Sequence, residues 1–440
     1  MRVLLIFPSW QRPGMHSVKL YQAPPLSLET LAALTPDDIE VSICDENAGR
    51  DPFDHDADLV GISVLTAAAP RAYQIAASYR GRGIPVVLGG FHPTFCPEEA
   101  GRHADAVVVG EAESVWPRVV ADARRDRLQP RYRGEPSAFA ATPVRPVRSL
   151  VSPRPYLTRN TVETSRGCPN RCHFCSVSRF YGGKYRRKPV DHVVADLRSL
   201  PDDDLIWFVA DNFPADRAYA MRLIDAVAEL GMPWICQASV RIARDRELLG
   251  RMAEGGCVMA FIGFETIDPA GLASVNKAWN DAAAYPQAIR AIHDHGISIL
   301  GSFMFGLDSH TPEVFDATVD FCIRNRVEAA QFSILTPWPG TPLYAAMERE
   351  GRLIDRDWSH YDGTQVVFRP RGMAVEQLQS GFYHAYNRFY SLSSIARRFL
   401  ATRAHRLNFL VANLGFRRAR AGFGRGASRI HAVPEPATTP

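Results

Sequence analysis

The sequence predicts an α/β protein. A doubly wound, Rossmann-like N-terminal domain precedes a partial (β/α)6 TIM barrel and a mostly helical C-terminal region. Short apolar runs rich in β-branched residues alternate with helical patterns twice, first over residues 1–127 and again over 157–345. From residue 346 onward the strand patterns disappear. A chain of 440 residues is long enough for two or three domains with sizeable cores.

The N-terminal domain is expected to contain a parallel sheet with strands covered on both faces. Near-continuous apolar runs predict strands at residues 3–7, 40–44, 59–64, 86–88 and 106–109. Between them, apolar residues repeat at helical spacing over 26–34 and 72–79. Ligands of such sheets bind beyond the carboxyl ends of the strands, which is where Gly89, Gly90 and Gly110 fall.

Residues 128–156 are expected to form an extended linker. Proline cannot donate a backbone hydrogen bond to a sheet or a helix interior, so a segment with repeated prolines favours a surface path. The prolines of this segment include Pro130, Pro136, Pro143, Pro146, Pro153 and Pro155.

The barrel is predicted from a second series of six strand patterns. They fall at residues 161–164, 205–209, 234–237, 258–263, 298–305 and 330–335, with helical patterns such as 220–230 and 282–295 between them. In barrels of this type the functional residues lie at the carboxyl ends of the strands.

The C-terminal part divides into a helical region, 346–415, and a basic tail, 416–440. Phe382, Tyr386, Phe389 and Tyr390 form an aromatic stripe at helical spacing, which is typical of a core helix, with a pocket wall for an apolar substrate as the alternative. The tail combines arginines with glycines and ends in a Pro/Ala/Thr segment. Such a composition predicts disorder, and binding to an anionic partner is the alternative.

Composition restricts the classes of function. A net charge of +4 gives no global electrostatic case for nucleic-acid binding. No stretch is long and apolar enough to be a transmembrane segment, and the N-terminal apolar run is too short for a signal peptide. Three of the eight cysteines are clustered and five are scattered, which indicates a reducing compartment and predicts a cytoplasmic protein.

The clustered cysteines, Cys168, Cys172 and Cys175, carry the strongest chemical signal in the chain. Three thiolates with three and then two intervening residues can wrap a short loop around an iron–sulfur cubane and leave one iron without a protein ligand. Because His173 lies inside the motif, a structural zinc site is the alternative. No second ligand pair accompanies the motif, so its spacing favours the cluster over zinc.

The motif CPNRCHFC at residues 168–175 resembles the cluster loop of radical S-adenosylmethionine (SAM) enzymes. Three further segments resemble strand ends of that superfamily: GFE at 263–265, NK at 276–277 and PWPGTPLY at 337–344. The N-terminal domain is similar to the cobalamin-binding domain that precedes the barrel in one branch of these enzymes. This similarity rests on PPLSL at 24–28, DLVGIS at 58–63, GGFHPT at 89–94 and GEAE at 110–113, and with the barrel the resemblance covers residues 1–345.

The resemblance implies three cofactors: a [4Fe–4S] cluster ligated by the three cysteines, SAM chelated by the open iron, and cobalamin. Phe174 would shield the cluster. The residues expected around SAM follow the second to fourth barrel strands, and for each of them a strand-terminal cap or surface salt bridge is the alternative: Asp211, Asn212, Gln237, Ser239, Arg241 and Glu265. The residues expected around cobalamin are Ser63, Thr66, Gly89, Gly90, His92, Pro93, Gly110 and Glu113.

One departure from many cobalamin enzymes concerns the lower face of cobalt. The motif Asp-x-His-x-x-Gly, which supplies an axial histidine, is absent from the N-terminal domain, and His92 does not replace it. The segment 63–66 would lie nearer the lower face and offers no strong ligand. We therefore hypothesise a weakly ligated cobalt that reaches the nucleophilic Co(I) state more readily.

The resemblance predicts a C-methyltransferase that methylates an unactivated carbon of a secondary metabolite or lipid-like small molecule, through a 5′-deoxyadenosyl radical and methylcobalamin. A radical cyclisation or redox rearrangement by an enzyme of the same branch is one alternative, and a non-catalytic, zinc-stabilised cobalamin protein is another. The expected partners are a small-molecule substrate of hydrophobic character and a low-potential electron donor such as flavodoxin or ferredoxin. The sequence specifies neither the substrate nor the oligomeric state.

Overall fold

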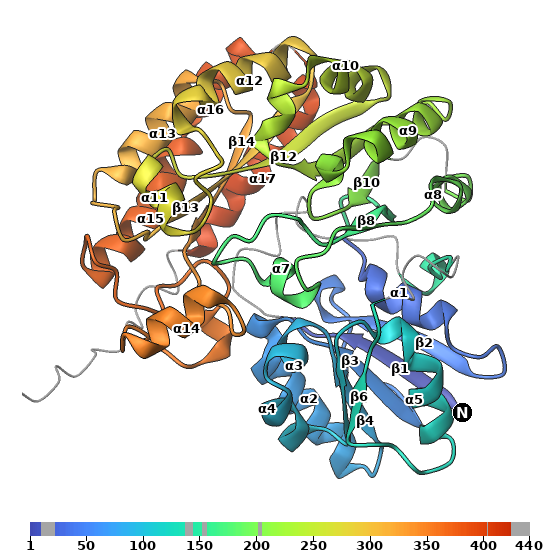
Figure 1. The fold of residues 1–440 in the computed structure, drawn as a ribbon. Helices are drawn as coiled ribbons and strands as arrows, with labels where there is room; N and C mark the ends of the chain where they lie inside the picture. The colour runs from blue at the N-terminus through green and yellow to red at the C-terminus, as the bar shows by residue number, and fades with distance from the viewer. Residues whose placement is uncertain (10–22, 137–143, 152–155, 201–204, 403, 424–440) are drawn as a thin grey trace, which may run out of the picture.

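The computed structural model describes residues 1–9, 23–136, 144–151, 156–200, 205–402 and 404–423. Figure 1 shows two sheet-based units, the N-terminal one in blue and cyan below and the second in green to orange above. Helix α7 (Ser176–Phe180) lies between them, and α14 (Pro342–Arg349) descends beside the lower unit. The predicted α/β class is confirmed.

The N-terminal unit is built on a six-stranded parallel sheet of order β2-β1-β3-β4-β5-β6. Five of its strands were predicted to within one residue at each end: β1 (Arg2–Phe7), β2 (Glu40–Asp45), β3 (Leu59–Ser63), β4 (Val86–Gly89) and β5 (Ala106–Val109). The longer helices of the unit are α1 (Leu26–Ala33), α2 (Ala69–Gly81), α4 (Pro97–His103) and α5 (Trp116–Ala123).

Each face of this sheet has its own apolar core. One core includes Ala72 and Ile75 of α2, and the other includes Leu28 of α1 together with Trp116 and Val119 of α5. Helices therefore cover both faces, which explains why the strands are apolar along their length rather than alternating. This is the doubly wound arrangement predicted from the sequence.

The sixth strand, β6 (Arg131–Arg133), lies inside the segment that was expected to be a linker, so that prediction is wrong for these residues. β6 pairs with β5 alone, at the edge of the sheet. Pro130 precedes it and contributes only its carbonyl, which accepts a hydrogen bond from Val107 N at 3.0 Å. Proline is compatible with the start of an edge strand, and the composition of the segment concealed this short pairing.

The second unit is an open barrel of six parallel strands in the order β14-β13-β12-β11-β10-β7. Its strands agree with the predicted ones to within two residues: β7 (Asn160–Glu163), β10 (Ile206–Val209), β11 (Trp234–Ala238), β12 (Cys257–Glu265), β13 (Ser298–Phe305) and β14 (Ala329–Ile334). The helices between them include α8 (Val190–Leu197), α9 (Arg217–Ala228), α10 (Arg246–Glu254), α12 (Tyr285–Asp294) and α13 (Val314–Arg324).

The aromatic stripe belongs to α15 (Val375–Phe389) and the residue after it, and it covers the outer edge of β14. Tyr386 Oη accepts a hydrogen bond from Phe332 N (3.1 Å) and donates one to Phe332 O (2.9 Å). Tyr390 Oη does the same for Ala330, at 3.0 and 2.8 Å. The side chains of the stripe are buried, and its two tyrosines hydrogen-bond the backbone groups that the edge strand β14 leaves unpaired. The interpretation of the stripe as core is therefore confirmed.

Two more helices follow, α16 (Leu392–Ala401) and α17 (Arg406–Phe423). Because α17 runs to Phe423, the tail expected from residue 416 begins as helix, and the rest of it lies outside the described residues. Within the described part of the chain, no helix is long and apolar enough to cross a membrane.

Candidate functional site

The cysteine loop begins directly after a short strand, β8 (Ser165–Arg166), at the carboxyl end of the first barrel strand. Gly167 has a positive φ of 83°, and a Cβ there would lie 2.0 Å from the carbonyl oxygen of Lys184. Its N–H donates to Asp211 Oδ2 at 2.7 Å. Only glycine fits this position, because both the dihedral and the close approach exclude a side chain.

The three thiols are removed from solvent to different extents. Cys172 is buried, whereas Cys168 and Cys175 are half-buried. Burial raises the pKa of Cys172 to about 12 and raises the pKa of the other two thiols as well. Such thiols ionise when an electropositive group binds them, and Asn212 Nδ2 lies 3.9 Å from the Cys168 sulfur, where it can donate to a thiolate.

The arrangement of the thiols can be compared with that of ligands around a single zinc ion. Sulfur ligands of one tetrahedral zinc lie about 3.8 Å apart, as bond lengths of about 2.3 Å require. Among the described residues, His92, Cys96 and Glu99 form the one group of three possible ligands within 4.8 Å of one another. The three sulfurs of the loop do not form such a group, so they are not at the mutual distances that a single zinc ion requires.

A second segment of the barrel clamps the cysteine loop. Asn276 Nδ2 donates to Arg171 O at 2.8 Å, and His173 N donates to Val275 O at 3.0 Å. His173 O in turn accepts from Leu343 N at 3.1 Å. The segment NK at 276–277 and the segment PWPGTPLY at 337–344 thus position the loop from two sides.

Glu265 and Lys277 form a buried ion pair beside the thiols, with Nζ 2.5 Å from Oε1. Glu265 has a positive φ of 66°, at an irregularity in the pairing of β12 with β13. A residue other than glycine in this conformation is strained, and such strain is typical of functional sites. The Lys277 charge acts against burial on the pKa of Cys168 and Cys172, so it favours their thiolates.

The remaining residues expected around SAM lie at the carboxyl ends of neighbouring strands. Gln237 lies near the end of β11 and Ser239 directly follows the strand; both are half-buried, and Ser239 N donates to Asn212 Oδ1 at 3.2 Å. Arg241 is exposed on the short helix η8 (Val240–Arg244), with its guanidinium 4.7 Å from the Trp279 ring centre. Phe174 packs against the barrel core at the cysteine loop.

Asp211 lies at the start of the cysteine loop, where its carboxylate accepts the Gly167 N–H and so positions the loop. Burial raises the pKa of Asp211 to about 6. The carboxylate is therefore a loop anchor in a region of low polarity.

A cavity of about 210 Å³ lies at the carboxyl edge of the N-terminal sheet. Five of the residues expected around cobalamin line it: Ser63, Gly89, Gly90, Gly110 and Glu113. Gly90 has a positive φ of 99°, and a Cβ there would lie 2.9 Å from Val64 N. A glycine-lined cradle open between two domains suits an elongated ligand whose tail enters the Rossmann-like sheet.

The barrel contributes to the same cavity through Arg166, Phe180 and Tyr181, which flank the cysteine loop. Phe180 stacks on Phe91 with ring centres 4.4 Å apart. The two regions that the sequence assigned to different cofactors are therefore joined at one boundary.

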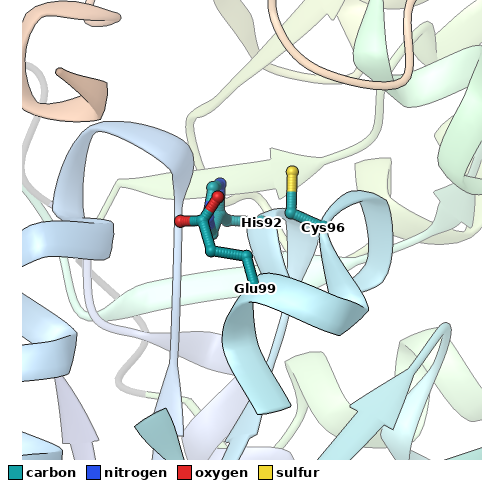
Figure 2. A group of neighbouring side chains, drawn as sticks. All are labelled: His92, Cys96 and Glu99. Atoms are coloured by element: carbon teal, nitrogen blue, oxygen red, sulfur yellow. The ribbon is translucent and has the colours of Figure 1, made fainter. Parts of the chain in front are cut away.

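Thr66, His92 and Pro93 are buried and are not among the residues that line the cavity. His92 Nε2 lies 3.0 Å from Tyr73 Oη and 3.4 Å from Glu99 Oε1. Figure 2 shows the side chains of His92 and Glu99 next to each other. Trp358, on the short helix η10 (Trp358–His360), donates Nε1 to the same carboxylate at 3.0 Å. The hydrogen bond from His92 lowers the pKa of Glu99 to about 2, so an anionic Glu99 joins the N-terminal unit to the C-terminal region.

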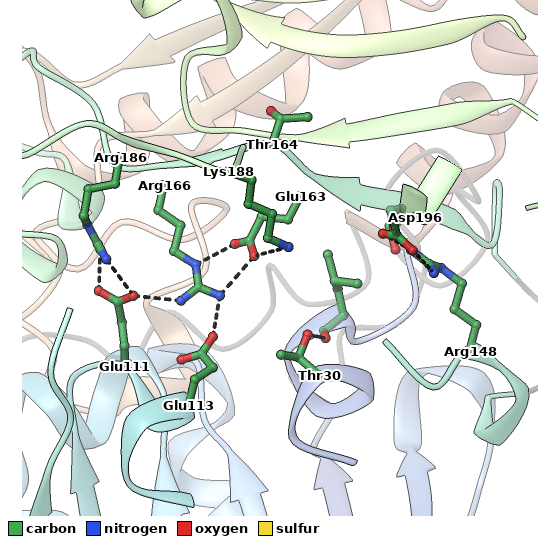
Figure 3. Close-up of polar contacts among 12 residues, drawn as sticks. Thr30, Glu111, Glu113, Arg148, Glu163, Thr164, Arg166, Arg186, Lys188 and Asp196 are labelled. Atoms are coloured by element: carbon green, nitrogen blue, oxygen red, sulfur yellow. Dashed lines mark hydrogen bonds and ion pairs between the residues drawn. The ribbon is translucent and has the colours of Figure 1, made fainter. Parts of the chain in front are cut away.

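An ionic network joins the two sheet units beside the cavity (Figure 3). Arg166 pairs with Glu111 (2.7 Å) and Glu113 of the N-terminal unit and with Glu163 (2.7 Å) of the barrel. Burial opposes ionisation of Glu163, but the charges of Arg166 and Lys188 outweigh it and lower its pKa. Glu113, which was expected near the cofactor, lines the cavity and also pairs with Arg166.

Sequence reasoning missed Arg166, Trp358 and the clamp role of Asn276. Arg166 and Trp358 act through partners distant in the chain, and no local pattern encodes such partners. Asn276 was signalled only by its place in a short motif.

A buried thiol loop at the first strand of a partial barrel, sharing a cavity with a Rossmann-like domain, defines an enzyme with two cofactor sites. Comparisons with known proteins agree with that class. Residues 17–120 match the B12 binding domain, 162–322 the Radical SAM superfamily, and 341–408 a domain of unknown function, DUF4070.

The chain is 31% identical over 392 residues to bacteriochlorophyllide d C-12(1)-methyltransferase of Chlorobaculum tepidum, and the match covers 85% of this chain and 84% of that protein. It is 28% identical to hopanoid C-2 methylase of Rhodopseudomonas palustris, covering 81% of this chain and 72% of that one. The structure of the radical SAM methyltransferase TsrM of Kitasatospora setae, with cobalamin and a [4Fe-4S] cluster bound, shares the fold. That comparison has a TM-score of 0.65 at 16% identity and covers 96% of this chain and 99% of TsrM.

The chain belongs to the cobalamin-dependent radical SAM methyltransferases. Its cofactors are a [4Fe–4S] cluster, SAM and cobalamin.

Proposed function

We propose that the protein methylates an unactivated carbon of a hydrophobic small molecule of the polycyclic or lipid-like class. One observation carries this proposal: Arg166 and Phe180, on either side of the cysteine loop, line the same cavity as the glycines of the Rossmann-like sheet. A substrate at this boundary would be reached from both cofactors. Relatives named for acting on bacteriochlorophyllide d and on a hopanoid support a hydrophobic substrate.

When bound, the cluster with SAM supplies the radical that removes a hydrogen atom, and cobalamin supplies the methyl group. The chain's own residues position these groups and exclude water. Gly167 and Asp211 fix the start of the cysteine loop, and Asn276 fixes its middle. We assign the contacts with SAM to residues at the carboxyl ends of β11 and β12, led by Ser239 and Glu265.

Aromatic side chains close the space between the two units. Phe180 contacts Phe91 and Phe95, with ring centres 4.4 and 6.3 Å apart. Gly340 allows this packing, because a Cβ there would lie 2.3 Å from the Phe95 ring. A dry boundary protects a radical from side reactions, so we assign water exclusion to these rings.

Anaerobic turnover with methyl-deuterated SAM tests the proposal, using porphyrinoid and triterpenoid compounds as candidate substrates. The expected result is a deuterated methylated product accompanied by both S-adenosylhomocysteine and 5′-deoxyadenosine. 5′-Deoxyadenosine without S-adenosylhomocysteine would instead indicate a cyclisation or rearrangement. The variant Cys172→Ala should form neither 5′-deoxyadenosine nor the methylated product.

A further inference from the structure

The exposed apolar side chains of this protein are concentrated at its C-terminal end. Among the described residues, six large apolar side chains are exposed, and five of them belong to α16 and α17. These five are exposed by between 52% and 80%: Leu392, Leu400, Leu407, Val411 and Leu414. The sixth, Phe53, lies in the N-terminal unit and is 37% exposed.

Helix α17 is apolar on two opposite faces. Its inner face packs Phe409 and Phe416 into the protein, and both are at most 3% exposed. Leu407 and Leu414 each precede one of these residues by two positions, which at about 100° per residue places them on the opposite side of the helix. A helix that needed only to cover a core would be polar on that outer side.

The apolar outer side continues around the corner into α16. Phe399 and Phe409 pack with ring centres 5.8 Å apart, and the Arg406 guanidinium lies 4.3 Å from the Phe399 ring centre. Leu400 and Leu407 adjoin this packed corner in the sequence, and they are 80% and 73% exposed. We call Leu400, Leu407, Val411 and Leu414 the C-terminal apolar face.

The two helices that carry this face contain arginines and no acidic residue. Between Glu376 and Glu435 the chain contains no acidic residue. The same interval contains ten arginines: Arg388, Arg397, Arg398, Arg403, Arg406, Arg417, Arg418, Arg420, Arg425 and Arg429. Of those whose side chains the structure describes, Arg397, Arg406 and Arg418 are exposed.

We propose that the C-terminal apolar face docks on the surface of an anionic lipid membrane. Aliphatic side chains on one helix face, bordered by the exposed Arg397, Arg406 and Arg418 on helices that contain no acidic residue, match the boundary between acyl chains and anionic headgroups. The protein lies on the membrane in this arrangement, since none of its described helices is able to span one. The inference does not depend on the identity of the substrate.

Flotation of the full-length, cofactor-loaded protein with lipid vesicles tests this proposal. One set of vesicles contains phosphatidylglycerol and phosphatidylcholine in equal parts, and the other contains phosphatidylcholine alone. The protein should float with the anionic vesicles, bind the neutral ones more weakly, and dissociate as salt is raised. The variant Leu407→Gln/Val411→Gln/Leu414→Gln should lower the partition coefficient at least about tenfold.

Matched control variants distinguish the C-terminal apolar face from effects of apolar exposure or net charge elsewhere on the protein. Phe53→Gln alters the exposed apolar residue of the other unit and should leave vesicle binding unchanged. Arg397→Gln/Arg418→Gln should weaken binding to anionic vesicles, whereas Arg198→Gln/Arg290→Gln, with the same change in net charge elsewhere, should not. Circular dichroism and iron content should match the wild type in every variant.

Three results would overturn the proposal. The first is wild-type binding that does not distinguish anionic from neutral vesicles, and the second is equal vesicle binding by the triple variant. The third is self-association of the wild type that the triple variant abolishes without an effect of lipid, because a second copy of the chain would then be the occupant of the face.

Discussion

At the scale of single residues, the cysteine loop depends on positions that carry no cofactor ligand. Gly167→Ala should destabilise the loop, since the new Cβ meets the Lys184 carbonyl oxygen at 2.0 Å and φ is 83°. We expect a loss of about 3 kcal/mol in the free energy of unfolding and poor iron incorporation after reconstitution. Gly182→Ala is the control: φ is 65° there but nothing lies within 4 Å, so the loss should be about 1 kcal/mol.

Glu29 gives the protein a defined pH dependence. Burial raises the pKa of Glu29 to about 7 from 4.5, so the folded state takes up its proton first as pH falls. Glu29 therefore destabilises the protein above pH 7, and this penalty disappears between pH 7 and 4.5. Glu29→Gln should stabilise the protein by about 3 kcal/mol at pH 8 and by little at pH 4.5, as measured by denaturant unfolding of the cofactor-free protein.

Glu98, whose carboxylate is on the surface, provides the control. If Glu98→Gln gave the same pH-dependent gain in stability, the gain in Glu29→Gln would not come from burial. A Glu29→Gln benefit that is constant across the whole pH range would contradict the assignment as well.

Lys277 places a positive charge beside the cluster thiols. Lys277→Met should make the reduction potential of the cluster more negative by on the order of 60 mV, since a cation favours the reduced, more negative state. Redox titration followed by electron paramagnetic resonance measures this shift. Lys277→Met/Glu265→Gln removes both charges of the pair and should return the potential towards that of the wild type, whereas the distant Arg290→Met should not change it.

At the scale of elements, α15 stabilises the open edge of the barrel sheet through two hydroxyl groups. Tyr386→Phe and Tyr390→Phe each leave a backbone N–H and C=O of β14 without a partner. Each variant should lower the free energy of unfolding by about 1–3 kcal/mol and speed amide exchange at Phe332 or Ala330. Tyr344→Phe on α14 should leave exchange in β14 unchanged.

The elements themselves were largely predictable, because long apolar strands and periodic helices are local signals. β6 was missed because three residues between prolines carry almost no pattern, and its pairing depends on the neighbouring strand. The cysteines of the candidate site were evident from their spacing alone. Arg166 and Trp358 were not, since each acts through carboxylates that lie far away in the sequence.

At the scale of the whole molecule, Arg166 joins the two sheet units. Arg166→Met should leave Glu111, Glu113 and Glu163 close together with less compensation, and we expect a loss of about 3–5 kcal/mol. Calorimetry should then resolve separate transitions for the two units. Arg217→Met is the control: it breaks an exposed pair with Glu247 and should lower the free energy of unfolding by less than about 1 kcal/mol. A single calorimetric transition in Arg166→Met would contradict the role of Arg166 in coupling the two units.

The bond from Trp358 to Glu99 spans 259 residues of the chain. During synthesis, the N-terminal unit leaves the ribosome long before its indole partner exists, so the face formed by His92 and Glu99 is completed last. On the ribosome, the contact between the C-terminal region and the N-terminal unit can therefore form only after the whole of that unit has been made. A chain interrupted before residue 358 would contain the strands of both sheets but lack this indole and helix α15, so that polar face and the edge of β14 would be left uncovered.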